Sequence, residues 1–388
     1  MKWEERIRVA LSKYDVRPSI IKAIADSGYI LTNLSPAVDP DVTLCLRDTF
    51  YGSKQMSGLF PIPKLLEYLN TGVYSKPTPP RYRIRSITHF EEILSGERHR
   101  NWHESGRMTF RGQPGEYFFQ RPFPNPYQSG KDGRELLILP SYWRQFRENF
   151  NARFSASEPQ SIFRTSLGDS FIYHGIDGWQ TLGEKNFERY GLHSLSDLAD
   201  FPDPESKEYY RRWWMFKSAG GGNPDIPLVE QHYGIDTHGL DVTFEPAIAL
   251  FFATHRFTLL PNGTATYRKI EGKHEGVVYS FVFHSPAVRL TSDLITKIES
   301  FEHIPAMRPL RQKCALRGFD AHCINEAVAD IDAVFEIADD FEFEGLPPKE
   351  ELFPNRKDDP LYSALLDAKK RFADIKDSPF VPIVEYAF

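Results

Sequence analysis

Residues 229–255 read VEQHYGIDTHGLDVTFEPAIALFFATH, and this stretch combines a strongly apolar run with a dense set of polar groups. The run that follows Pro246 is apolar on nearly every side, which predicts a helix buried in the core. The segment LDVT before it alternates apolar and polar residues, which predicts a strand with Asp241 and Thr243 on one face. We therefore expect a polar pocket whose floor is the start of the buried helix, where an anion is favoured.

The polar side chains of this stretch admit three interpretations. In the first, His232 acts as an acid or base and Tyr233 stacks on a flat ring of a ligand. In the second, the same groups form a satisfied buried network, in which Asp241 caps the helix and His232 bonds to backbone. In the third, His232, Asp236, His238 and Asp241 hold a metal ion, although their spacing matches no familiar ligand signature.

A second polar segment, GRMTFRGQPG, occupies residues 106–115. The letters MTF predict a strand that runs into a glycine-rich turn. At its end Arg111 offers a planar, bidentate grip on phosphate, and Gln113 supplies an amide that donates and accepts. Gly112 lets a ligand approach the backbone closely. The alternative is that Arg111 pairs internally with an acid and that Gly112 only turns the chain.

The composition indicates a protein with a sizeable core and no bias toward nucleic acid. Of the 388 residues 41% are hydrophobic, and the net charge of -6 argues against nonspecific nucleic-acid binding, which needs a basic face. The basic letters RYRIR at 81–85 are interpreted as a solvated strand or linker. We expect no membrane span and no secretory signal. Cys45, Cys314 and Cys323 fit reduced thiols in a cytoplasmic protein.

Helices and strands are expected in mixed order, without regular alternation. The expected helices lie at 3–35 with a stop at Gly28, at 62–72, at 86–95 with Ser86 or Thr88 as the cap, at 143–154, at 205–218 and at 361–372. The expected strands lie at 42–51, 108–110, 240–243, 275–290 and 333–345. Residues 76–80, KPTPP, are interpreted as a linker. This order predicts an α+β fold with a mixed or antiparallel sheet core and packed helices.

Four stretches follow one another in a characteristic order: SITHFEEIL with TFRGQ, LPSYWR, the opening stretch and RPLRQ. In this order they resemble the FRG domain family, named for its Phe-Arg-Gly motif. The specific part is QHYG followed by LDxT, a proline and ALFFA. The resemblance implies an FRG-like domain over 86–345, preceded by a mainly helical extension over 1–80 and followed by a C-terminal helix and tail over 346–388.

The chain departs from the family pattern at several positions. His238 stands where the family has an arginine, Val242 where it has a tryptophan, and Asp236 where it has a proline. The late Gln-Gln-Gly segment is Gln312-Lys313-Cys314 in this chain. If the family arginine holds an anion, His238 holds it more weakly and with a dependence on pH.

A second likeness concerns chemistry. A strand that ends in Phe-Arg-Gly resembles the first motif of arginine-type ADP-ribosyltransferases, whose fold splits its sheet and whose arginine grips the phosphates of NAD. The likeness implies NAD as the ligand and a glutamate that steadies the ribose, for which Glu344 of the Glu342-x-Glu344 pair is the candidate and Glu336 is a rival. The NAD-binding residues implied are Arg111, Gly112, Gln113, Tyr233, Thr243 and Gln312. The catalytic residues implied are Arg111, His232, Asp241 and Glu344.

These resemblances lead to one expected function and two alternatives. The expected function is an ADP-ribosyltransferase-like enzyme that binds NAD, cleaves its nicotinamide–ribose bond and transfers ADP-ribose to a macromolecular acceptor, with residues 1–80 recruiting a partner protein. The first alternative is a nucleotide-sensing or protein-interaction module without catalysis, which the departures at His238 and Val242 favour. The second is a metal-dependent hydrolase, although no metal is expected.

Overall fold

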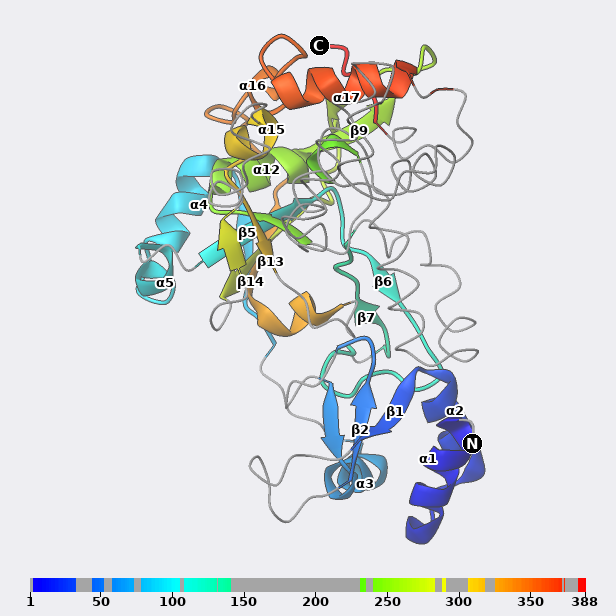
Figure 1. Cartoon of the computed structure of the whole chain (residues 1–388). Coiled ribbons are helices and arrows are strands. Elements are labelled where there is room, and N and C mark those ends of the chain that lie inside the picture. Colours follow the sequence, from blue (N-terminus) through cyan, green and yellow to red (C-terminus); the bar gives the residue numbers. More distant parts are fainter. Residues whose placement is uncertain are drawn as a thin grey trace, which may run out of the picture.

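The computed structural model in Figure 1 describes most of the chain and leaves a long central part aside. The described residues are 3–32, 44–51, 58–72, 78–104, 108–130, 132–140, 231–234, 240–282, 288–290, 306–317, 325–371, 373 and 383–388. The aromatic helices expected at 143–154 and 205–218, most of LPSYWR, and the residues Asp236, His238 and Cys323 lie outside these ranges. The fold is α+β with a mixed sheet, which confirms the predicted class.

The N-terminal part contains strands as well as the expected helices, and it lies at the end of the molecule opposite the C-terminus (Figure 1). The helices are α1 (Trp3–Leu11), α2 (Pro18–Asp26) and α3 (Ile62–Thr71). The strands β1 (Tyr29–Thr32), β2 (Cys45–Asp48) and β3 (Leu59–Pro61) form an antiparallel sheet in that order. Gly28 and Gly72 follow α2 and α3 with φ of 83° and 66°, left-handed values that glycine adopts without strain.

A seven-stranded sheet forms the centre of the molecule, in the order β12-β13-β8-β5-β11-β14-β4. The strands are β4 (Arg81–Ile84), β5 (Met108–Gln113), β8 (Leu240–Thr243), β11 (Val277–Val282), β12 (Val288–Leu290), β13 (Cys314–Arg317) and β14 (Ile331–Ile337). All neighbours are antiparallel except β14 and β4, which run parallel. Strands β5 and β8 meet at one residue pair, Phe110 with Thr243. The two strands therefore separate beyond this pair.

Strand β14 is shorter than the expected strand at 333–345. It ends at Ile337, and the chain then turns through Asp339 and Asp340 to Gly345, which has a φ of 85°. Aspartate is depleted in strands and favoured in turns, so the pair of aspartates ends the pairing.

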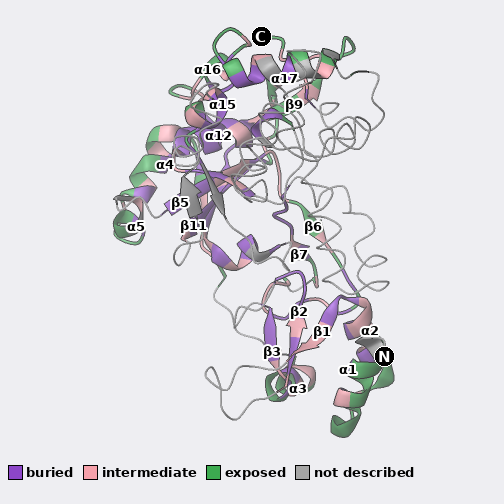
Figure 2. Cartoon of the chain, viewed as in Figure 1, coloured by how far each residue is buried: buried purple, intermediate pink, exposed green. Residues whose placement is uncertain are grey.

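Helix α12 (Pro246–Thr254) is the buried helix predicted from the opening stretch, and eight of its nine residues are buried (Figure 2). It packs directly on β5 and β11, where two glycines make room for it. A Cβ atom on Gly112 would lie 1.8 Å from the carbonyl oxygen of Ala249, and one on Gly276 would lie 2.2 Å from that of Ala253. Gly112 therefore admits the backbone of this helix, which is a different role from the expected close approach of a ligand.

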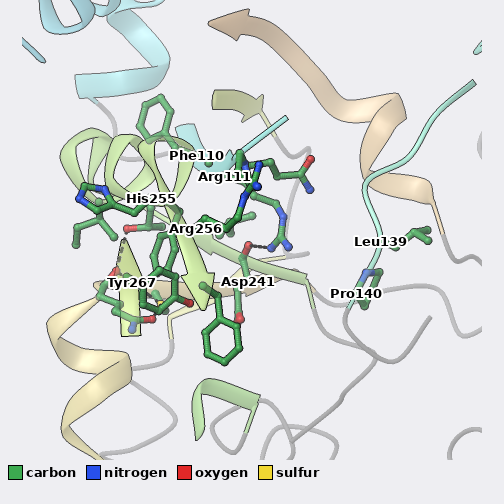
Figure 3. A pocket seen from close by; sticks show the side chains of 18 of the residues that line it. Phe110, Arg111, Leu139, Pro140, Asp241, His255, Arg256 and Tyr267 are labelled. Carbon is green, nitrogen blue, oxygen red and sulfur yellow. Dashed lines mark hydrogen bonds between the residues drawn. The ribbon is translucent and has the colours of Figure 1, made fainter. Parts of the chain in front are cut away.

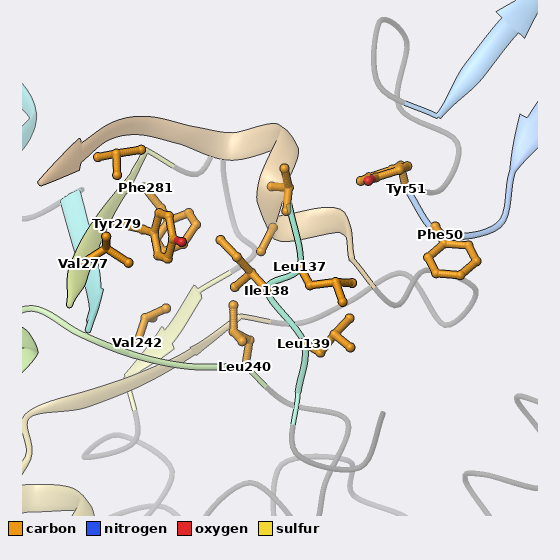
Figure 4. Close-up of a cluster of buried hydrophobic side chains, with 13 residues drawn as sticks. Phe50, Tyr51, Leu137, Ile138, Leu139, Leu240, Val242, Val277, Tyr279 and Phe281 are labelled. Atoms are coloured by element: carbon orange, nitrogen blue, oxygen red, sulfur yellow. The ribbon is translucent and has the colours of Figure 1, made fainter. Parts of the chain in front are cut away.

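The other face of the sheet packs on the segment that follows strand β7 (Glu135–Leu136). Figure 4 shows Leu137, Ile138 and Leu139 against Val242 and Tyr279 of the sheet. Strand β7 pairs with β6 (Phe118–Phe119), so this segment links the central sheet to the N-terminal part. Both faces of the central strands are thus covered, as their burial requires.

The remaining elements surround α12 and the sheet. Helix α4 (Ile87–Leu94) is capped by Ser86, whose hydroxyl accepts from the backbone N–H of His89 at 3.1 Å, so Ser86 and not Thr88 is the cap. The others are α5 (Arg100–Glu104), the hairpin of β9 (His255–Leu259) and β10 (Ala265–Lys269), α15 (Met307–Arg311), α16 (Lys349–Leu352) and α17 (Pro360–Arg371). Among the residues just described, no helix has the length and apolar character needed to span a bilayer.

Candidate functional site

A cavity of about 620 Å³ opens where β5 and β8 separate. One group of polar side chains in its lining comes from three segments that are far apart in the sequence, namely the end of β5, strand β8 and the start of β13 with the turn before it. These side chains are Arg111, Gln113, Asp241, Thr243, Gln312 and Cys314. Figure 3 shows Arg111 and Asp241 facing one another on one side, with Leu139 and Pro140 across from them. The sequence prediction that two polar segments share one pocket over α12 therefore agrees with the structure.

Asp241 is the carboxylate of this cavity, and Arg111 and His232 contact this residue. Arg111 donates through Nη1 to the backbone oxygen of Asp241 at 2.6 Å (Figure 3). The Nε2 atom of His232 lies 3.4 Å from Oδ1 of Asp241. The side chain of Asp241 is 37% exposed, so its carboxylate faces the cavity while His232 supports it from behind.

The neighbours of His232 hold its imidazole ring in place. Its Nδ1 atom lies 3.3 Å from Oε1 of Gln312. The amide of Gln312 is oriented by its other end, because Nε2 donates to the backbone oxygen of Leu352 at 3.1 Å. Both ring nitrogens of His232 therefore face acceptors, a carboxylate and an amide oxygen. These contacts fix the orientation of the imidazole ring beside Asp241.

Cys314 also borders the cavity, and sequence reasoning did not select it. Its Sγ atom lies 3.6 Å from the backbone oxygen of Gln312 and 3.8 Å from Nδ1 of His232. Burial raises the pKa of the Cys314 thiol well above its usual value, the charge of Asp241 raises it further, and Arg111 opposes the shift. The thiol is thus neutral and donates to Gln312, which makes it a poor nucleophile. No spacing in the sequence marks this residue.

Gln113 and Thr243 have different roles in the lining. Gln113 is 7% exposed, and its Oε1 atom has no hydrogen-bond partner within the described part of the chain, so it is an acceptor for a donor in the cavity. Thr243 donates to the backbone oxygen of Gln312 at 3.0 Å and accepts from the N–H of Glu245 at 3.1 Å. Thr243 therefore holds the residue that precedes α12, and Lys313 pairs with Glu245 there at 2.5 Å. The side chain of Glu245 does not cap the helix, and the expected anion site at its start stays a prediction.

Three predicted site residues lie outside the cavity lining: His232, which contacts Asp241 from behind, Tyr233 and Glu344. Tyr233 is buried, and its hydroxyl donates to Oδ2 of Asp359 at 2.8 Å while the guanidinium of Arg308 stacks on its ring at 4.7 Å. Burial raises the pKa of Tyr233 well above its usual value, and the charge of Asp359 adds to the shift. Glu344 is exposed in the turns after β14. Neither Tyr233 nor Glu344 is in a position to touch a ligand that fills the cavity as it stands. The rival Glu336 forms an ion pair with Arg81 at 2.6 Å.

The hairpin β9–β10 supplies groups that the sequence analysis passed over. Arg256, Phe257 and Tyr267 line the cavity, and Phe257 is 45% exposed. The letters Pro-Asn-Gly at 261–263 between two alternating segments are a recognised hairpin signal, and Gly263 has a φ of 80° there. This signal predicts a hairpin directly after the buried helix, with Arg256, Phe257 and Tyr267 on its two strands.

Within the described ranges, no three His, Cys, Asp or Glu side chains lie close enough together to hold a metal ion. Two of the four proposed metal ligands, Asp236 and His238, lie outside these ranges. Comparison of the chain with protein-family models, with curated proteins and with solved structures finds no match. The likeness to the FRG family therefore stays a prediction, and the site has to be interpreted from its own chemistry.

Proposed function

We propose that this cavity binds a nucleotide of the NAD type and that the protein cleaves the bond between its nicotinamide and ribose. The observation that carries the proposal is the convergence of Arg111, Gln113 and Asp241 in one cavity of about 620 Å³. That volume falls within the range of ligand pockets, and aromatic rings of Tyr117, Phe252 and Tyr267 are part of the lining.

Each group has a defined task in this proposal. Arg111 binds a phosphate oxygen, for which a guanidinium is well suited. The unpartnered oxygen of Gln113 accepts from the amide of nicotinamide, and an aromatic ring of the lining packs on the flat base. The carboxylate of Asp241 faces the ribose, in the role that the sequence likeness gave to Glu344.

The reaction is a glycosyl transfer. The C–N bond between ribose C1′ and the pyridinium nitrogen breaks, its electron pair stays on the ring, and neutral nicotinamide leaves. Positive charge develops on the ribose, and a nearby carboxylate stabilises it as in glycosidases. Water or a nucleophile of the acceptor then bonds to C1′ and releases a proton to the solvent. His232 keeps Asp241 in place throughout, so it is a positioning residue.

The test is the release of nicotinamide from NAD by the purified protein, with NAD binding measured by calorimetry. Arg111→Met is expected to weaken NAD binding at least about tenfold, because a charge-assisted hydrogen bond to phosphate is lost. Asp241→Asn is expected to reduce turnover by about a hundredfold or more with a smaller effect on binding. The matched control is Arg83→Met, which removes an exposed arginine that pairs with Asp339. Absence of both NAD binding and nicotinamide release in the parent protein contradicts the proposal.

A second candidate function is the binding of the same nucleotide without turnover. The observation that favours it is the exposed position of Glu344 outside the cavity. In this case NAD binds with an affinity that depends on Arg111, but the bound nucleotide is recovered unchanged after hours of incubation. Chromatography of the nucleotide after incubation separates the two candidates.

A further inference from the structure

A second hollow of about 370 Å³ lies beside the cavity, and the two share the side chains of His255 and Tyr267. In Figure 3 both side chains lie on the side of the cavity opposite Leu139 and Pro140. The second hollow is lined by β9, β10, the turns after β14 and the start of α16. It thus continues beyond the wall of the first cavity.

The charged groups of this hollow are all basic within the described part of the chain. Lys269 and Lys349 line it together with His255. Lys269 places its Nζ atom 3.3 Å from the ring centroid of Phe343, and Lys349 donates to Oγ1 of Thr266 at 3.4 Å. Among the described residues neither lysine has a carboxylate within ion-pair distance. Glu344 flanks Phe343 in the sequence but lies outside the lining. This is unusual for a chain whose net charge is -6.

The pKa of His255 is sensitive to the positive charges of Lys269 and Lys349. Burial lowers its pKa, the hydrogen bond to the backbone oxygen of Phe251 opposes the shift, and the charges of Lys269 and Lys349 lower the pKa further. The Nδ1 atom lies 3.1 Å from that oxygen and donates to it, so the neutral ring keeps its lone pair on Nε2. Both lysines therefore lie close enough to His255 to act on it, and an anion between them would reverse their effect.

Folding alone does not account for this arrangement. Lys269 stands directly opposite His255 in the register of the hairpin, and its charge disfavours protonation of that imidazole. An ammonium on a phenylalanine ring gains about 0.5–1 kcal/mol at an exposed site, less than its three donors can gain from an oxyanion. Lysine binds phosphate as a point charge, and two lysines without a neighbouring acid can both direct their charge to one phosphate.

We propose that this hollow is a phosphate-binding site, in which Lys269 and Lys349 hold a phosphomonoester group. The phosphate has two sources with the same chemistry. It belongs to the nucleotide in the neighbouring cavity, as the extra ribose phosphate of an NADP-type dinucleotide, or it is free inorganic phosphate. The site does not depend on cleavage of the nucleotide.

The test uses the full chain and inorganic phosphate, titrated at constant ionic strength against chloride. We expect saturable binding by calorimetry, and a rise in the pKa of His255 on binding, followed by NMR with His255→Gln to assign the signal. Lys269→Met or Lys349→Met weakens phosphate binding about tenfold, and the double variant weakens it about a hundredfold, since each removes one charge-assisted contact. Arg268→Met is the matched control, because Arg268 carries the same charge on the opposite face of the same strand.

Two results overturn the site: phosphate that produces no more effect than chloride, or phosphate affinity that is unchanged in the folded double variant. The comparison of NADP with NAD identifies the source of the phosphate. Tighter binding of NADP that is lost in the double variant assigns the site to the cavity ligand. Phosphate binding with equal affinity for NADP and NAD assigns it to the free ion. Phosphate binding without any binding of NAD leaves this site intact and contradicts the proposed function alone.

Discussion

Arg111 and Arg121 are consecutive arginines in the chain, but their surroundings differ. Arg121, at the junction with the N-terminal part, has a fully buried side chain and donates five hydrogen bonds, to Asp48, Glu135 and the backbone oxygen of Ser27, at 2.6–3.0 Å. A guanidinium has five N–H donors, so every one is used. Arg111 is half-buried, donates to a neutral carbonyl and borders a cavity.

The difference is between a charge enclosed by its partners and a charge that borders a cavity. The two carboxylates around Arg121 are themselves bonded to neighbours, since Tyr51 donates to Glu135 and Asn125 donates to Asp48, both at 2.8 Å. Such a closed network leaves nothing for a ligand, and its role is to join the N-terminal part to the rest of the molecule. At Arg111 the charge lies beside space that an anion can enter.

The largest expected effect comes from opening the closed network. Arg121→Met is expected to lower the free energy of unfolding by about 4 kcal/mol, because two buried carboxylates lose their counter-charge. Urea unfolding at pH 7 measures it. Adding Glu135→Gln to this variant should recover part of the loss, since one uncompensated charge is then removed. The control Arg83→Met, at an exposed pair, should cost less than about 1 kcal/mol. Equal losses in the two single variants would erase the distinction between the arginines.

The second-largest expected effect concerns Gly112, which follows Arg111 in the Phe-Arg-Gly motif. Gly112→Ala is expected to lower the free energy of unfolding by about 3 kcal/mol, because the added methyl group overlaps the backbone of α12. The control is Gly115→Ala, three residues along the chain. A Cβ atom on Gly115 would lie 3.8 Å from the backbone oxygen of Glu275, which is an ordinary van der Waals contact. If Gly112→Ala keeps its stability and loses only ligand binding, then the glycine serves the ligand, as the sequence suggested, and not the helix.

Local patterns allowed much of this fold to be predicted. The apolar run after Pro246, the stops at Gly28 and Gly72 and the alternation of LDVT each reflect short-range physics, so helix α12, the N-terminal helices and strand β8 follow from the sequence. Arg111 and Asp241 are 130 residues apart, and the expectation that they share a pocket came instead from the resemblance. The pairing of β5 with β8 was not predicted. No local pattern encodes which strands become neighbours.

The limits of the sequence appear where partners are remote. Tyr233 reads as a candidate for stacking on a ligand until Asp359 and Arg308 are seen around it, and Cys314 reads as an ordinary thiol until Asp241 and His232 are beside it. Glu344 fits an E-x-E spacing, yet the chain has left the strand before it. In each case the decisive fact is a tertiary contact, which spacing along the chain does not determine.

The smallest expected effect tests whether Tyr233 belongs with the enclosed groups, like Arg121, or with the groups that border the cavity, like Arg111. Its hydroxyl is bonded within a closed group like that of Arg121: Asp359 accepts from Tyr233 at 2.8 Å and from the backbone N–H of Arg308 at 3.0 Å. Tyr233→Phe is therefore expected to lower the free energy of unfolding by about 1.5 kcal/mol, because one buried hydrogen bond to a charged group is lost. The same change should leave NAD affinity within about twofold, since no contact in the cavity is altered.

The matched variant on the cavity side is Tyr267→Phe, because Tyr267 lines the cavity and stacks on Phe353 at 4.6 Å. Removal of its hydroxyl keeps that packing and changes the polar lining of the cavity, so its effect should appear in ligand affinity more than in stability. Unfolding curves and NAD titrations of both variants complete the comparison. If Tyr233→Phe weakens NAD binding more than it weakens the fold, then the buried tyrosine reaches the ligand through a rearrangement of the cavity, and the division between closed and open groups fails at this residue.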